Sequence, residues 1–147
     1  MTFPSVPFCR SILLNRVSAT MAGAVVLAIG LGGAALPSFA ADVAKEVSTA
    51  ADHAGYAADA TIIDTTYTHL HHTINCLVGP GGADFDSKAQ NPCAAMGNGA
   101  IPDSTDAAQK QALQMALEKA KAGLASNDMA AAKADASAAQ AILKKAM

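Results

Sequence analysis

The residues of this chain with the clearest capacity for chemistry are its histidines, all of which lie between positions 53 and 72. Three of them, His69, His71 and His72, fall in the stretch THLHHTINC. Residues three apart share a face of an α-helix, so His69 and His72 are expected to present their imidazoles side by side. His71 is also a candidate ligand, although it is expected to point elsewhere, toward the side of Asp64. Zn, Cu and Ni all accept imidazole ligands, so the pair predicts a transition-metal site.

This pair needs further ligands, and no histidine follows residue 72. His53 lies roughly 24 Å from His69 along a straight helix, because each residue adds about 1.5 Å. It can therefore join the site only across a sharp bend at Gly55 or from a second subunit. Thioether ligands would favour Cu(I), whereas carboxylates would favour Zn or Cu(II). The candidate additional ligands are Met96, Met115, Asp64, Asp106 and Glu118.

The competing interpretation of the histidines involves no metal. Helix-borne histidines are often solvated or hydrogen-bonded polar residues, and this is the expectation for His71. The chain would then be an interaction or stress protein whose histidine end and neighbouring loop form a protein contact surface. A non-covalent haem held between helices by one histidine is a further alternative.

Other catalytic and binding motifs are incomplete. Asp84, Asp86 and Asn91 are spaced as in a calcium loop, but Ala89 and Ala95 stand where that loop needs Gly and Glu. The Gly79–Gly82 run lacks the Gly-Lys-Ser/Thr of a phosphate-binding loop. No serine sits in a nucleophile elbow, and few large apolar residues are present to line a substrate pocket. No enzymatic activity is predicted.

The first forty residues have the pattern of a cleavable export signal. Two arginines in the first sixteen residues precede an uncharged run from Ala19 to Leu36, and small residues at Ser38 and Ala40 suit cleavage after Ala40. The prediction is a secretory signal peptide over 1–40 and a periplasmic or secreted chain over 41–147, with no membrane association after cleavage. The alternative is a membrane anchor, because the uncharged run approaches the minimum length for spanning.

The segment 41–147 suits one small domain. It contains every acidic residue of the chain and no arginine, so it is more acidic than the net charge of −2 for the whole sequence. Nucleic-acid binding requires a basic face that neutralises phosphate, and that function is therefore excluded.

Two cysteines, Cys76 and Cys93, remain after the predicted cleavage. A pair of cysteines in an oxidising compartment predicts a disulfide, which here would tie an irregular loop back to the preceding helix. Thiolate metal ligation is the alternative for this pair.

Periodicity predicts helices along the rest of the chain. Apolar residues recur in steps of three and four over about 42–78, which predicts an amphipathic helix that Gly55 bends or splits. Its apolar stripe comprises Tyr56, Ala60, Ile63, Tyr67, Leu70, Ile74 and Leu77. A Gly- and Pro-rich loop is expected over 79–102, with Gly79 ending the helix.

A helical hairpin is expected over about 103–146, with Asp103 or Ser104 capping its first helix and Ser126 or Asn127 its second. Both of its apolar seams are rich in alanine and bury little area per residue. The fold class predicted is all-α, a three- or four-helix up-down bundle. Association into a homo-oligomer would add buried apolar area to this small core.

Two parts of the chain resemble known small exported bacterial proteins. The segment 53–103 is similar to a recurring pattern in such helical proteins of no assigned function: HxHHxxNC, then Gly79-Pro80, then Asn91-Pro92-Cys93. The Ala- and Lys-rich hairpin is similar to small periplasmic metal-binding helical proteins. Those carry histidines throughout their helices, whereas the hairpin here has none, which limits this chain to one or two sites. The predicted function is periplasmic binding of a transition metal, copper more than zinc.

Overall fold

The computed structural model describes residues 40–147, so the predicted signal peptide, apart from Ala40, lies outside the described residues. Within this range there are five helices and no strand, as the all-α prediction requires. They are α1 (Val43–Asp59), α2 (Ile63–Val78), α3 (Ala100–Asp103), α4 (Ala107–Ala125) and α5 (Met129–Ala146). None of the helices in the described range is both long enough and apolar enough to cross a membrane.

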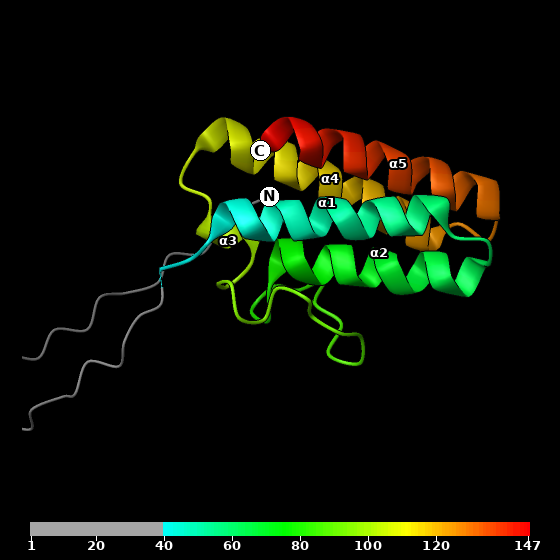
Figure 1. Cartoon of the computed structure of the whole chain (residues 1–147), viewed down its shortest axis with the longest axis horizontal. Helices are drawn as coiled ribbons and strands as arrows, with labels where there is room; N and C mark the ends of the chain where they lie inside the picture. The colour runs from blue at the N-terminus through cyan, green and yellow to red at the C-terminus, as the bar shows by residue number, and fades with distance from the viewer. Residues whose placement is uncertain (1–39) are drawn as a thin grey trace, which may run out of the picture. The chain divides into compact units, whose positions relative to one another are not determined.

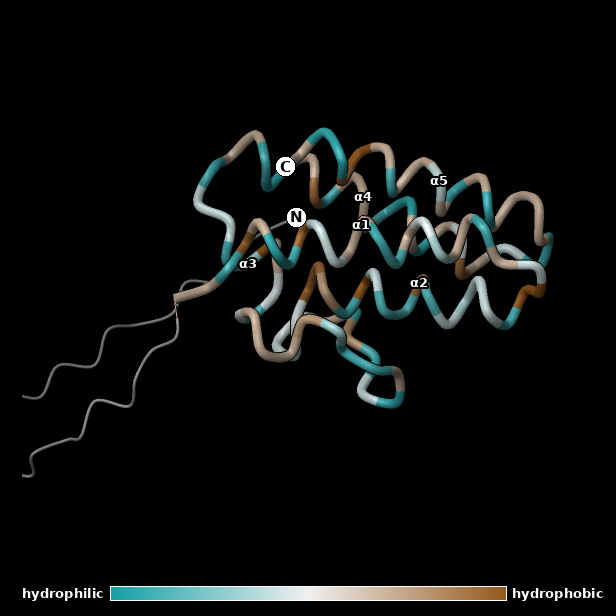
Figure 2. The backbone as a smooth tube through the Cα atoms, viewed as in Figure 1, coloured by the Kyte–Doolittle hydropathy of each residue, from teal (hydrophilic) through white to brown (hydrophobic). Residues whose placement is uncertain are grey.

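Each of the four long helices packs along two others. α1 lies between α2 and α5, and α4 packs against both α5 and α2, with the single-turn α3 at one end (Figure 1). Hydrophobic and hydrophilic segments alternate along these helices, as expected for amphipathic elements with one buried side (Figure 2).

The long first helix expected over 42–78 is two helices, and the predicted bend at Gly55 is wrong. Gly55 lies inside α1, where a Cβ atom would meet the side chain of Gln140 on α5. The chain instead reverses over residues 60–62, where Ile62 is extended at φ −133°. The β-branched run Thr61–Ile63 disfavours continuation of the helix. Lys133 stabilises the reversal, because its Nζ donates to the carbonyl oxygen of Ala60 at 2.8 Å.

Aspartates cap three of the long helices. The side chains of Asp42, Asp106 and Asp128 each accept a hydrogen bond from the backbone N–H three residues later. The caps expected at Asp103 or Ser104 and at Ser126 or Asn127 are therefore wrong. A short extra turn, α3, moves the start of the first hairpin helix to Ala107, and the second hairpin helix begins at Met129 after its cap, Asp128. An N-cap oxygen satisfies an otherwise unpaired helical N–H, so these three positions define where the helices begin.

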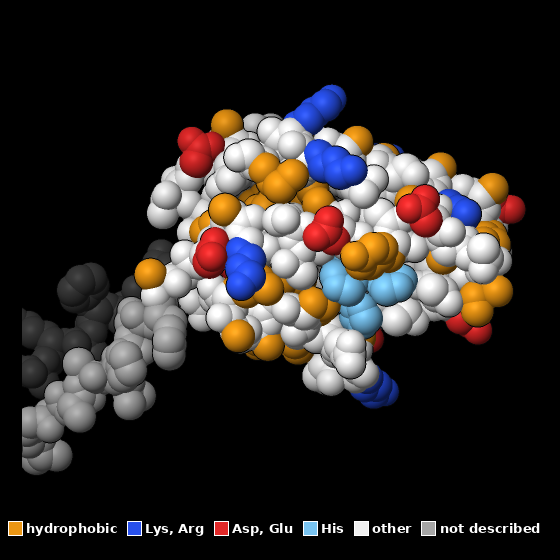
Figure 3. All heavy atoms as spheres, viewed as in Figure 1, with side chains coloured by type: hydrophobic (Ala, Val, Ile, Leu, Met, Phe, Trp, Pro, Cys, Tyr) orange, Lys and Arg blue, Asp and Glu red, His pale blue; other side chains and the backbone are white. Residues whose placement is uncertain are grey.

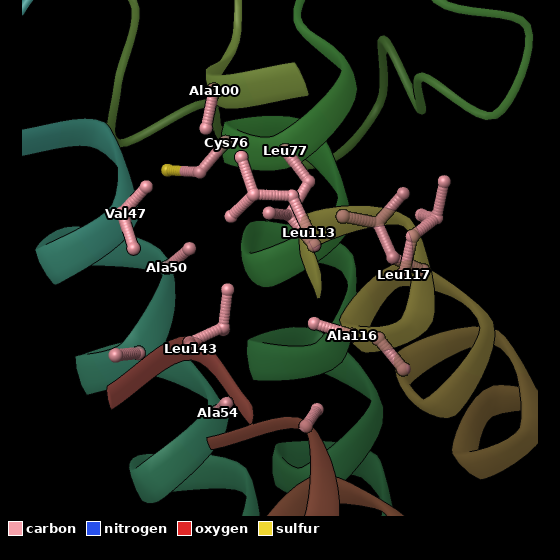
Figure 4. Close-up of a cluster of buried hydrophobic side chains, with 14 of the residues drawn as sticks. Val47, Ala50, Ala54, Cys76, Leu77, Ala100, Leu113, Ala116, Leu117 and Leu143 are labelled. Atoms are coloured by element: carbon pink, nitrogen blue, oxygen red, sulfur yellow. The ribbon is translucent and has the colours of Figure 1, made fainter. Parts of the chain in front are cut away.

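The core is made mainly of alanines and leucines. Leu77 of α2 meets Leu113 and Leu117 of α4, while Ala50 and Ala54 of α1 face Leu143 of α5 (Figure 4). The predicted hairpin seams are confirmed, with their central residues buried. Tyr56 does not belong to the apolar stripe in which it was predicted, because its side chain is 55% exposed.

The loop between α2 and α3 is held at both ends. Gly79 ends α2 at φ 62°, as predicted, and lies against Gly99, whose φ is 115°. The buried carboxylate of Glu46, a residue that sequence reasoning did not single out, accepts a hydrogen bond from the Gly99 N–H at 3.0 Å. Desolvation by burial raises the pKa of this carboxyl, and the Gly99 hydrogen bond partly opposes the shift.

The predicted pairing of Cys76 with Cys93 is confirmed. Their sulfur atoms lie 2.01 Å apart and their Cα atoms 5.2 Å apart. The bond joins the last part of α2 to the loop that follows it, and both residues are buried in the core. The loop is therefore attached to the helix that carries three of the four histidines.

Candidate metal centre

The reversal at residues 60–62 brings three histidines together from two helices. His53 lies six residues before the end of α1, and His69 lies six residues after the start of α2. Because the two helices pack together through so short a turn, these positions face each other, and His72 lies one turn beyond His69. Figure 3 shows the histidine side chains gathered in one patch on this face, beside a hydrophobic side chain. We call His53, His69 and His72 the histidine triad.

The imidazole rings of the triad converge. The Nδ1 atoms of His53 and His69 are 3.1 Å apart. The ring centroids lie 5.3 Å apart for His53 and His69, 4.9 Å for His53 and His72, and 5.6 Å for His69 and His72. One nitrogen from each residue can be chosen so that all three lie within 4.8 Å of one another.

The shortest of these distances is close to what a first-row transition metal requires, and it is also that of a hydrogen bond between two imidazoles. A metal–nitrogen bond of about 2.0–2.1 Å in tetrahedral geometry places two ligand nitrogens roughly 3.3 Å apart. The separation of 3.1 Å between the Nδ1 atoms of His53 and His69 is close to this spacing. The third nitrogen lies within 4.8 Å of the others, so the rings would have to turn toward one another to hold one ion.

The surroundings keep the triad neutral, which is the protonation state that a metal ligand needs. Desolvation by burial, with the nearby charges of His72 and His69, lowers the pKa of His53 to about 4, although Asp52 opposes the shift. Burial also lowers the pKa of His69. Burial lowers the pKa of His72, helped by His69 and His71.

One nitrogen of the triad is buried without a hydrogen-bond partner. The side chain of His72 is only 7% exposed, and its Nδ1 has no partner within the described part of the chain. An unpaired buried polar atom costs roughly 1–3 kcal/mol. A ligand at this position would remove that cost, so the orphaned nitrogen fits a site that binds a further atom.

Tyr56 covers the outer side of the triad. Its ring meets His53 edge-on at a centroid distance of 5.5 Å and lies 5.4 Å from the ring of His69. Tyr56 comes one turn after His53 on α1, so helical geometry places its ring over the neighbouring imidazole. Sequence reasoning missed this role, although the spacing of three residues from His53 was the available signal.

His71 and Asp64 do not join the triad. The Nδ1 of His71 lies 3.2 Å from a carboxylate oxygen of Asp86 in the following loop. Asp64 is exposed in the first turn of α2. His71 therefore contacts the loop and is not one of the three converging histidines.

The remaining candidate ligands are engaged elsewhere. The sulfur of Met96 lies 3.7 Å from the hydroxyl oxygen of Thr49. Thr49 lies one turn before His53 on α1. Met115 is 52% exposed and lines a surface groove between α4 and α5. Asp106 caps α4, and Glu118 pairs with Lys121 at 3.5 Å.

Comparisons of this chain with protein-family models, with curated proteins and with solved structures find no match. The case for a metal centre therefore rests on the side-chain geometry of His53, His69 and His72.

Proposed function

We propose that this protein is an exported, periplasmic binding protein for one transition-metal ion, copper in preference to zinc, held by His53, His69 and His72. The observation that carries the proposal is the convergence of three imidazoles from two helices, with one nitrogen from each within 4.8 Å of the others. The role proposed is binding and not catalysis. The resemblance to small periplasmic metal-binding proteins belongs to the same proposal.

The architecture supports the assignment. We interpret α1, α2, α4 and α5 as an up-down four-helix bundle, a fold in which facing helices commonly supply metal ligands. A pair of histidines three apart on one helix and a single histidine on its neighbour form a rigid set, because packing fixes the distance between the helices.

The preference for copper follows from the donor atoms. Imidazole nitrogens bind Cu(II), Zn(II) and Ni(II), and the Irving–Williams order places Cu(II) above Zn(II) for a given nitrogen site. The predicted export removes the chain from a reducing cytosol, which favours Cu(II) over Cu(I). Three neutral imidazoles therefore give a copper site that zinc also occupies when copper is scarce.

The test is native mass spectrometry of the protein purified from periplasm without a histidine tag. One copper or zinc ion per chain, retained through a wash with a weak chelator, is the expected result. A metal-free protein that binds several ions weakly would contradict the proposal. Capture of one protein partner regardless of chelator would then favour the contact-surface interpretation.

The metal-free protein should lose stability as the pH falls. The pKa of His53 is about 4 in the folded protein and 6.5 when unperturbed, so between these values the unfolded chain binds a proton that the folded chain does not. The free energy of unfolding therefore falls as the pH drops from about 6.5 toward 4. Thermal unfolding at pH 7 and pH 5 should show a melting temperature several degrees lower at pH 5. A His53→Gln variant should show a smaller difference in melting temperature between pH 7 and pH 5. Identical pH dependence in the variant and the natural protein would contradict the assignment of this effect to His53.

A further inference from the structure

Residues 86–93 of the loop after α2, which we call the 86–93 loop, form a wall beside the histidine triad. An open surface pocket of about 370 Å³ is lined by residues of this loop and of α2: Asp86, Lys88, Ala89, Gln90, Thr68, His71 and His72. His72 is the most enclosed histidine of the triad, at 7% exposed. The loop therefore stands between one metal-binding imidazole and solvent.

Asn75 attaches this wall to α2. Its side chain is fully buried, three residues after His72. The Asn75 Oδ1 accepts a hydrogen bond from the N–H of Asp86 at 2.9 Å. Its Nδ2 donates to the carbonyl oxygens of Asp86 at 2.9 Å, Gln90 at 3.1 Å and Ala89 at 3.5 Å. One amide side chain thus uses both of its ends to hold a five-residue span of loop.

Two other contacts hold the same loop. The disulfide fixes its far end, because Cys93 is bonded to Cys76 on the turn of α2 that follows His72. The His71 Nδ1 lies 3.2 Å from the Asp86 carboxylate, on the side of the pocket next to His72. All three attachments come from residues 71–76 of α2, which is the segment that carries His72.

We propose that the 86–93 loop controls release of the metal, and that Asn75 is the positioning residue that keeps this loop in place, with the Cys76–Cys93 bond as its second anchor. The inference rests on the proposed function and extends it. The loop encloses His72 from one side, so the His72 ring keeps its orientation only while the loop stays in place. Groups that orient a metal ligand typically change metal affinity roughly 10- to 100-fold when they are removed.

The experiment measures how fast Cu(II)-loaded protein gives up its metal to excess chelator. Asn75→Ala should release copper roughly 10- to 100-fold faster than the natural protein. Asn75→Asp keeps the acceptor for the Asp86 N–H but sets a carboxylate oxygen against the loop carbonyl oxygens, and should release copper at least as fast as Asn75→Ala. Asn127→Ala is the matched control, because Asn127 is an exposed asparagine in the turn before α5. The double variant Cys76→Ser/Cys93→Ser should also release copper faster. Serine is used because it introduces no free thiol that could bind the metal.

Two further measurements separate positioning from general loss of stability. Leu143→Val weakens the core on α5, away from the loop, and should leave the release rate unchanged when compared below its melting temperature. The electron paramagnetic resonance spectrum of bound Cu(II) should change in Asn75→Ala and stay constant in Leu143→Val. Equal release rates in Asn75→Ala, Asn127→Ala and the natural protein would overturn the inference while leaving the metal site intact. Absence of any bound copper in the natural protein would instead overturn the proposed function.

Discussion

Replacing His53 with alanine is expected to abolish one-to-one copper binding, with a loss of affinity above roughly 100-fold. This exceeds the effect expected for groups that only orient a ligand, because the substitution removes one of three donor atoms. The residue lies sixteen positions from His69 in sequence, yet its Nδ1 is 3.1 Å from the Nδ1 of His69. Isothermal titration of metal-free protein with Cu(II) measures the affinity and the stoichiometry together.

The matched control for this substitution is His71→Ala. His71 is also a histidine of the cluster and follows His69 by two residues, but it pairs with Asp86 and lies outside the triad. Its removal takes away one attachment of the 86–93 loop but no donor atom of the triad, so one copper ion per chain should remain bound. His69→Ala/His72→Ala should lose binding as His53→Ala does. Equal affinities of His53→Ala and His71→Ala would show that clustered surface imidazoles, and not the triad, bind the metal.

Reduction of the disulfide is expected to lower the melting temperature by roughly 12 to 24 °C. The cysteines are 17 residues apart in sequence. Closing a loop of this size stabilises a protein by about 3 kcal/mol in the chain-entropy description. In a small domain, each kcal/mol shifts the melting temperature by about 4 to 8 °C. Thermal unfolding of the metal-free protein, followed by circular dichroism with and without a reductant, measures the shift.

The disulfide is important for stability because the core buries little apolar area. Most of the buried positions on α1 and α5 are alanines, which contribute little apolar area each. The control is Cys76→Ser/Cys93→Ser, which should melt at the lower temperature and show no further change with reductant. Equal melting of the oxidised and reduced natural protein would mean that the loop is held by Asn75 and its neighbours without help from the disulfide.

Local physics accounts for the parts of the fold and site that could be predicted from sequence. A spacing of three residues places His69 and His72 on one helix face wherever that helix lies. The apolar seams of α4 and α5 follow from the same periodicity, and Gly79 ends α2 because a glycine accepts a positive φ. The pairing of Cys76 with Cys93 followed from their being the two cysteines after the predicted signal.

The third histidine of the triad was placed by tertiary structure. A continuous helix over 42–78 would have kept His53 far from His69, and neither glycine nor proline marks the reversal at residues 60–62. The β-branched run Thr61–Ile63 is a weak signal for a turn, since such residues also occur within helices. The reversal becomes favourable because α1 and α2 then bury their apolar faces against each other and against α4 and α5. The sequence by itself determined a histidine pair on one helix, and only the packing of a second helix beside it added His53 to make the triad.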